Sequence, residues 1–347
     1  MATTYDFIAQ NKRRTWLLVL LFPITFALLG GVVLFGISYV SESQNQSSFS
    51  SSDADYYADT NDIYYDQSPA VSAAQQAAFL AVVVLPVLWL AALLWILIAY
   101  FSGDAWLLRG AGAFEIHAAD QPEIYRLVEN LCIAQGLPVP RVYIMDDESL
   151  NAFATGRDPE HASLALTKGI VKRLERPELE GVIAHELSHI KNRDIRLMLI
   201  TVAGISFCTF LAEVCFRTAI RSSRSRNSKN NGALLFLIAG LFFTVYGYCI
   251  APLIRLAVSR TREYQADASA ALMTRNPGAL ARALEKISGD PRVEALDAHA
   301  SMAAMCIANP LGQMGLFSWI SGLFATHPPT EKRIAKLREM DKDVMRG

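Results

Sequence analysis

The chain has 347 residues, of which 52% are hydrophobic and 19% are charged, and its 32 basic residues nearly balance 33 acidic ones. A soluble globular chain carries about 25% charged residues, so this composition indicates membrane segments and excludes an intrinsically disordered or collagen-like chain. The balanced charge also excludes a global basic field, and we expect no nucleic-acid partner.

Four apolar runs are long enough to cross the ~30 Å hydrocarbon core of a bilayer, and we expect about four transmembrane helices. The runs predict an N-terminal segment (1–15), a first transmembrane helix (16–40), an acidic polar loop (41–76), a second transmembrane helix (77–101), a polar-patterned region (102–196), a hydrophobic helical hairpin of two membrane segments (197–254) and a C-terminal region (255–347).

The distribution of basic residues predicts the orientation in the membrane. Lys12, Arg13 and Arg14 precede the first run, whereas the loop 41–76 contains acids and no Lys or Arg. Because basic residues favour the cytoplasmic side, the N-terminus and the region 102–196 are expected inside and the loop outside. The loop between the third and fourth runs, 217–231, is basic as well, so the hairpin either crosses against this rule or dips into the bilayer without crossing.

The polar regions predict a mainly helical α+β fold with a small β-sheet. Apolar residues at helical spacing favour a helix over 121–135, and a helix opening at Pro177 is expected to run on toward the third apolar run. The remaining expected elements are strands over 141–145, 151–155 and 161–167 and helices over 260–273, 279–287 and 330–340. The five cysteines include no CxxC pair and are expected as small buried hydrophobic residues. Glu213 is expected to pair with Arg217 one turn later.

The helix that follows Pro177 carries the sequence His185-Glu186-Leu187-Ser188-His189. Two histidines at i and i+4 lie on one helical face, so both imidazoles can reach one Zn²⁺ ion. Glu186 is placed to hold a metal-bound water, which is the arrangement of a metalloprotease.

A catalytic zinc needs a third protein ligand, and Glu263 is the best candidate. Asp267 follows at i+4 and would hydrogen-bond one of the ligand histidines from behind. The alternative is that Glu263 is a solvated acid paired with Arg260 or Arg262. Because the histidines precede the third apolar run and Glu263 follows the fourth, the site assembles only if the hairpin has both ends on one face of the membrane.

Taken together, four segments resemble the HtpX family of membrane-bound zinc metalloendopeptidases, which are gluzincin-like. They are the helix motif 185–189, the segment 262–267, Leu150-Asn151-Ala152-Phe153-Ala154-Thr155-Gly156 and Thr326-His327-Pro328-Pro329, and 137–143 also fits. The resemblance implies a zincin-like catalytic domain made of 102–196 and 255–347.

The resemblance also implies the roles of individual residues. One Zn²⁺ per chain is expected on His185, His189 and Glu263, with Glu186 as general base. The segment 151–155 is expected to be an edge strand to which unfolded or damaged membrane proteins add as a further strand. Asn151 and His327 are expected to stabilise the oxyanion. Asp194 is expected either to support a zinc ligand from the second layer of residues or to have a structural role.

For the whole molecule, the resemblance implies proteolytic quality control and a stress response. It implies a multi-pass protein of the inner (plasma) membrane, in contact with the lipid bilayer, whose catalytic site faces the cytoplasm. The sequence does not predict the oligomeric state.

Three other functions were weighed. A CAAX-type prenylated-protein endopeptidase shares the ligand set but has more spans. An intramembrane protease of the site-2 type would place its ligands inside apolar spans and carry a later Asp-Gly motif. A zinc-binding membrane scaffold without protease activity is disfavoured because every catalytic position is filled.

Overall fold

The fold was analysed in a computed structural model, which forms two compact units. The structure describes residues 13, 17, 20–28, 30–31, 75, 79, 82–83, 85–223, 232–257, 260–289, 306–307 and 328–346. The first unit contains 96–206 and 248–347, and the second contains 19–95 and 207–247. Each unit is described by itself.

The first unit contains a four-stranded sheet with the order β1-β2-β4-β3. The strands are β1 (Ala113–Ile116), β2 (Arg141–Met145), β3 (Ala152–Gly156) and β4 (Ala162–Thr167). β2 and β4 are parallel, and the two outer pairs are antiparallel. The three expected strands are present with ends shifted by at most one residue, whereas β1 was not expected. β3 therefore lies at one edge of the sheet.

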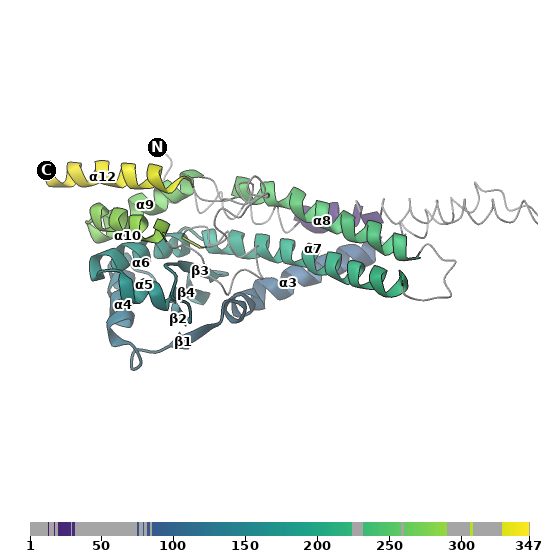
Figure 1. The fold of residues 1–347 in the computed structure, drawn as a ribbon, viewed down its shortest axis with the longest axis horizontal. Helices are drawn as coiled ribbons and strands as arrows, with labels where there is room; N and C mark the ends of the chain where they lie inside the picture. The colour runs from purple at the N-terminus through teal and green to yellow at the C-terminus, as the bar shows by residue number, and fades with distance from the viewer. Residues whose placement is uncertain are drawn as a thin grey trace, which may run out of the picture. The chain divides into compact units, whose positions relative to one another are not determined.

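The helices of this unit bury their apolar stripes against the sheet and against one another. They are α4 (Pro122–Gln135), α5 (Lys168–Arg173), α6 (Arg176–Lys191), α9 (Arg260–Thr274), α10 (Pro277–Gly289) and α12 (Thr330–Arg346). Leu164 of β4, Ile183 of α6 and Leu284 of α10 belong to one continuous core. Figure 1 shows α6 beside the sheet, with α9, α10 and α12 on its other side. The short helix α5 was not expected from the sequence.

The start of α6 is fixed by its first turn. The backbone N–H of Glu175 donates to Oε2 of Glu178 at 3.0 Å, which satisfies a donor at the helix entry. Glu178 is 1% exposed and also accepts from Lys286 of α10 at 2.7 Å. The first turn of α6 is thereby tied to α10.

The end of α6 corrects a sequence expectation. The helix does not run on into the third apolar run: it stops at Lys191, and α7 (Asp194–Ser223) begins three residues later. Arg193 between them has φ 59°, a left-handed conformation that interrupts an α-helix. This turn ends α6 and places Asp194 at the beginning of α7.

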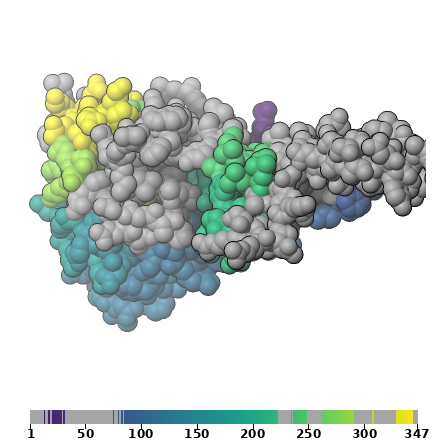
Figure 2. Space-filling view, turned by 45° about the vertical axis from the view of Figure 1, so that its right-hand side comes forward, coloured from purple at the N-terminus to yellow at the C-terminus, as the bar shows by residue number. Residues whose placement is uncertain are grey.

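Close helix packing brings the C-terminal helices onto α6. A Cβ atom added at Gly181 of α6 would lie 3.1 Å from Cβ of Leu280, so the glycine permits a close approach of α10. α12 in turn packs on α10. Figure 2 shows these two helices side by side at the surface, α12 in yellow and α10 in light green.

The second unit is built from apolar helices joined by aromatic contacts. The ring of Phe207 lies 5.2 Å from that of Phe26 and 5.2 Å from that of Trp95, measured between centroids. The hydroxyl groups of Thr25 and Tyr246 share a hydrogen bond of 2.6 Å. Described residues of all four apolar runs therefore take part in one packed cluster.

Two of the described helices are long and apolar enough to cross a membrane. They are α3 (Leu85–Gly110) and the segment Asp194–Arg221 of α7, with mean hydropathies of 2.1 and 2.0. α8 (Gly232–Ala257) contains a shorter apolar segment, Phe236–Gly247. Most of the first run lies outside the described residues, so the expected number of four spans stays a prediction. The expected ion pair between Glu213 and Arg217 is confirmed.

Candidate metal centre

The two histidines of α6 lie on one face of the helix and are buried. His185 is 0% and His189 is 7% exposed. Their Nε2 atoms are 3.3 Å apart, and the rings stand nearly perpendicular at 83°. The one-turn spacing of the sequence therefore brings two nitrogen donors to one point.

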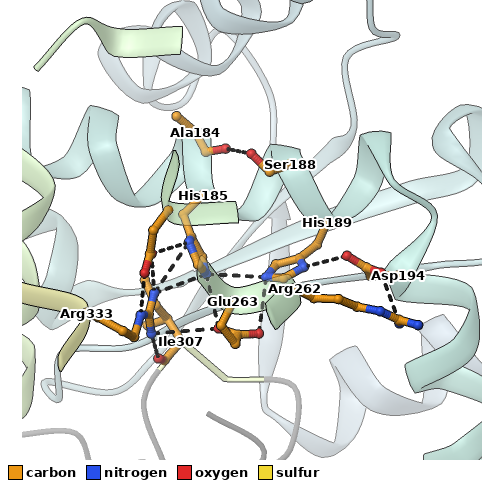
Figure 3. Close-up of polar contacts among 10 residues, drawn as sticks. Ala184, His185, Ser188, His189, Asp194, Arg262, Glu263, Ile307 and Arg333 are labelled. Carbon is orange, nitrogen blue, oxygen red and sulfur yellow. Dashed lines mark hydrogen bonds and ion pairs between the residues drawn. The ribbon is translucent and has the colours of Figure 1, made fainter. Parts of the chain in front are cut away.

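Glu263 of α9 provides the third donor at the same point. One carboxylate oxygen lies 3.7 Å from Nε2 of His185, and the other lies 3.7 Å from Nε2 of His189. Figure 3 shows Glu263 facing both rings. Glu263 is 0% exposed, so the alternative of a solvated acid is wrong, and Arg262 pairs with Asp194 instead.

The three donors fit a tetrahedral metal ion. Metal–ligand bonds of 2.0–2.2 Å in a tetrahedron place neighbouring ligand atoms about 3.4 Å apart. The two Nε2 atoms are 3.3 Å apart, and one ligand atom from each of the three residues lies within 4.8 Å of the other two, so a small adjustment of the side chains would reach this value. Two imidazoles and one carboxylate are a ligand set of catalytic zinc sites that leave a fourth position open. The residues present therefore fit Zn²⁺.

A carboxylate lies behind each histidine. Nδ1 of His185 is 3.0 Å from Asp267, and Nδ1 of His189 is 3.0 Å from Asp194. With a carboxylate accepting the Nδ1–H hydrogen, each ring keeps its Nε2 lone pair for a metal. The structure thus places the two predicted supporting residues, Asp267 and Asp194, on different histidines.

Two buried arginines hold these carboxylates in turn. Arg262 donates to Asp194 at 3.1 Å, and Arg333 of α12 donates to both oxygens of Asp267 at 2.9 and 2.7 Å. Arg333 is 1% exposed, and its guanidinium lies 3.8 Å from Glu263. The bidentate interaction of the Arg333 guanidinium fixes the plane of the Asp267 carboxylate. In this way α12 supports the site.

Sequence reasoning missed Arg333, although one signal was available. It lies four residues before the buried Leu337, on the apolar stripe of an amphipathic helix. A basic residue on such a stripe must be paired when the stripe is buried. The spacing alone does not say which acid pairs with it.

The charges of the centre shift the pKa values of its groups in the metal-free protein. Burial alone would lower the pKa of His189, but the hydrogen bond with Asp194 and the charge of Glu263 raise it to about 9. Burial alone would raise the pKa of Asp267, but Arg333 and the His185 ring lower it to about 2. Asp267 is therefore ionised throughout the physiological range, as a hydrogen-bond acceptor for His185 must be.

The remaining predicted residues lie in different relations to this centre. Glu186, next to His185, is 2% exposed. Asn151 is 0% exposed at the start of β3, a strand on which α6 packs, and its Oδ1 accepts from the N–H of Ala152 at 3.0 Å. His327 lies outside the described residues. The roles of these three residues stay predictions.

The donor set and the His-Glu-x-x-His sequence on a buried helix fit a metalloprotease. The family model for peptidase family M48 matches residues 118–341, which is more than half of the chain. The chain belongs to peptidase family M48.

Individual relatives agree with this assignment and confirm the predicted resemblance to the HtpX family. The chain is 47% identical over 250 residues to a protease HtpX homolog of Bacteroides fragilis strain YCH46, covering 71% of this chain and 77% of the relative. It is 36% identical over 341 residues to a protease HtpX homolog of Thermoanaerobacter pseudethanolicus, covering 97% of this chain and 98% of the relative. This second alignment includes the N-terminal apolar runs.

Among solved structures, the chain is similar to the crystal structure of S. mikatae Ste24p. The similarity has a TM-score of 0.42 and 19% sequence identity, and it covers 70% of this chain and 55% of that chain. At these values the match adds nothing to the assignment from sequence.

Proposed function

We propose that the protein is a zinc-dependent endopeptidase that hydrolyses peptide bonds in misfolded or damaged membrane proteins on the cytoplasmic side of the inner membrane. The observation that carries this proposal is the donor set of His185, His189 and Glu263, each histidine being oriented by its own carboxylate. A carboxylate that accepts the Nδ1–H hydrogen leaves the Nε2 lone pair of each ring available to a metal ion. Two histidines that only packed against a neighbouring helix would not need this orientation.

We assign the proton transfer steps to Glu186. When bound at the three donors, Zn²⁺ supplies a Lewis acid for the scissile carbonyl and makes a bound water acidic. Glu186 follows His185 on α6 and takes the proton of the attacking water. The same carboxyl group then gives the proton to the leaving amine, which lets one residue serve as base and as acid.

The edge strand β3 binds the substrate backbone. An extended peptide can add to a free strand edge by main-chain hydrogen bonds, which select little for side-chain identity. This suits unfolded segments of many sequences. We assign oxyanion stabilisation to His327 and Asn151, and one such donor typically contributes about 2.7–4 kcal/mol to catalysis.

The flanking charges support a cytoplasmic site. Lys12, Arg13 and Arg14 precede the first apolar run, and the loop 41–76 is acidic, which favours a cytoplasmic location of both catalytic regions. α7 begins at Asp194, a partner of His189. A metal centre near the membrane surface would have the loops of other membrane proteins within reach.

The test is casein cleavage by detergent-purified protein loaded with zinc. We expect cleavage by the wild type, its loss on adding a chelator, and its loss in Glu186→Gln with zinc still bound. Glu180→Gln, a half-buried glutamate on the same helix, is the matched control and should cleave as the wild type does. If the wild type binds zinc and cleaves neither casein nor another unfolded protein, the proposal of a general degradative protease is wrong.

A further inference from the structure

β3 has one edge that is not paired within the sheet. Successive residues of a strand direct their N–H and C=O groups to opposite sides. The carbonyl of Asn151 accepts from the N–H of Thr167 at 3.0 Å, so Asn151 faces β4. The backbone groups of Ala152 and Ala154 therefore face the other side, which is the edge proposed above for substrate.

This edge is already occupied at Ala152. The N–H of Ala152 donates to Oδ1 of Asn151, and its carbonyl accepts from the backbone N–H of Ile307 at 2.9 Å. Ile307 comes from a part of the chain that is distant in sequence, and it is 2% exposed. For Ala154, no hydrogen-bond partner on this edge lies among the residues that the structure describes.

Ile307 is also hydrogen-bonded to a residue that supports the metal centre. The carbonyl of Ile307 accepts from Nη1 of Arg333 at 3.2 Å, and Arg333 holds Asp267. Figure 3 shows Ile307 beside Arg333 and Glu263. Ile307 thus joins the edge of β3 to the residues that support the metal ligands.

Cys306, next to Ile307, is buried as well. Cys306 is 0% exposed, and burial, with the charge of Glu186 as a second cause, raises the pKa of its thiol. Glu186 is 2% exposed and Glu263 is 0% exposed. In this arrangement both carboxylates are closed off from solvent.

We propose that Cys306–Ile307 occupies the place of a substrate strand on β3, and that a substrate must displace this segment before it is cleaved. The inference rests on the proposed function, because it concerns a part of the same chain that competes with the substrate for the same site. A competitor lowers the fraction of binding-competent protein and raises the apparent Kd by the inverse of that fraction. Weakening the competitor should therefore lower KM.

The first test removes the hydrogen bond from Ile307 to Ala152. Ile307→Pro lacks the N–H donor, whereas the control Ile307→Val keeps it together with most of the side chain. For a zinc-loaded enzyme and an unstructured peptide substrate, we expect Ile307→Pro to lower KM about three- to tenfold, the equivalent of one net hydrogen bond. An unchanged or raised KM in a folded, zinc-binding Ile307→Pro protein would overturn the inference.

The second test does not depend on that variant or on turnover. Glu186→Gln protein is loaded with zinc, and alanine replaces the cysteines other than Cys306, which are Cys132, Cys208, Cys215 and Cys249. Peptide binding is followed by fluorescence anisotropy, and the labelling rate of Cys306 is measured with a maleimide. We expect saturating peptide to accelerate labelling, because the segment leaves its buried position.

The outcomes separate the two proposals. Peptide that binds while Cys306 labels at an unchanged or slower rate contradicts the displacement and leaves the peptidase assignment intact. Peptide that does not bind to the zinc-loaded protein contradicts the proposed function and the displacement with it.

Discussion

Arg333 supports the metal centre although it is distant in sequence from the metal ligands. It lies on the last helix and holds Asp267, which in turn orients His185. The spacing of His185, His189 and Glu263 could be interpreted from sequence because one helical turn dictates which side chains meet. The partnership of Arg333 could not, because it depends on how α12 packs in three dimensions.

Replacing Arg333 with alanine should destabilise the protein strongly. Removing one partner of a buried ion pair leaves an uncompensated charge, here Asp267, and typically costs about 3–5 kcal/mol. Arg338→Ala is the control on the same helix, because Arg338 is 63% exposed and pairs with Glu285 at the surface. Its loss should cost less than about 1 kcal/mol. Thermal unfolding in detergent measures both, and equal effects of the two substitutions would contradict the structural role of Arg333.

The raised pKa of His189 predicts how metal binding depends on pH. The pKa of this group in the metal-free protein is about 9, above its ordinary value of 6.5. The protonated ring therefore stabilises the metal-free fold fully below pH 6.5, and this contribution is lost as the pH rises through about 9. A ligand histidine must be neutral, so binding Zn²⁺ at pH 7 releases the proton.

We expect the apparent zinc affinity to rise with pH by about tenfold per unit for each displaced proton, and to level off above about pH 9. Titration against a chelator of known affinity, with the pH dependence of that chelator subtracted, measures this slope. An affinity that is constant between pH 7 and pH 9 would contradict the ion pairs around His189.

Among the helices and strands of the first unit, the sequence pattern predicted most but not all. The expected helix 121–135 is α4, Pro122–Gln135, and the expected strand 141–145 is β2. The strand β1 and the helix α5 were missed because each is too short to show a period. The break at Arg193 was missed because helical spacing continues across it, and only the backbone conformation reveals the turn.

The packing of α10 on α6 depends on the absence of a side chain at Gly181. A Cβ atom there would lie 3.1–3.3 Å from atoms of Leu280, so Gly181→Leu must push α10 away. We expect a loss of about 1–3 kcal/mol in the free energy of unfolding. It should also weaken zinc binding, because α6 carries the ligands.

Gly289→Leu is the matched control for this substitution. Gly289 ends α10, and a Cβ atom added there meets nothing within 4 Å. A leucine at this position enters open space and favours the helix, so stability should not fall. Equal losses in the two variants, measured by thermal unfolding, would contradict the close contact between α6 and α10.

For the molecule as a whole, the proposed function requires the two catalytic regions, 102–196 and 255–347, to lie on the cytoplasmic side. Cysteine labelling in a chain without its native cysteines tests this orientation. An impermeant maleimide should label Ser48→Cys, in the loop 41–76, in intact cells. It should label Asn130→Cys on the exposed side of α4 only after lysis. The opposite result would reverse the proposed orientation, since the basic flanks alone support it.

The proposed function depends on one zinc site made by His185, His189 and Glu263. The most direct measurement is the zinc content per chain, determined after reloading and removal of free metal, in the wild type, Glu263→Ala and Glu180→Gln. We expect one zinc ion per chain in the wild type and in Glu180→Gln. In Glu263→Ala we expect the zinc to be lost when free metal is removed, because two histidines alone bind the ion weakly. Retention of one zinc ion by Glu263→Ala would place the third ligand elsewhere and contradict the site described.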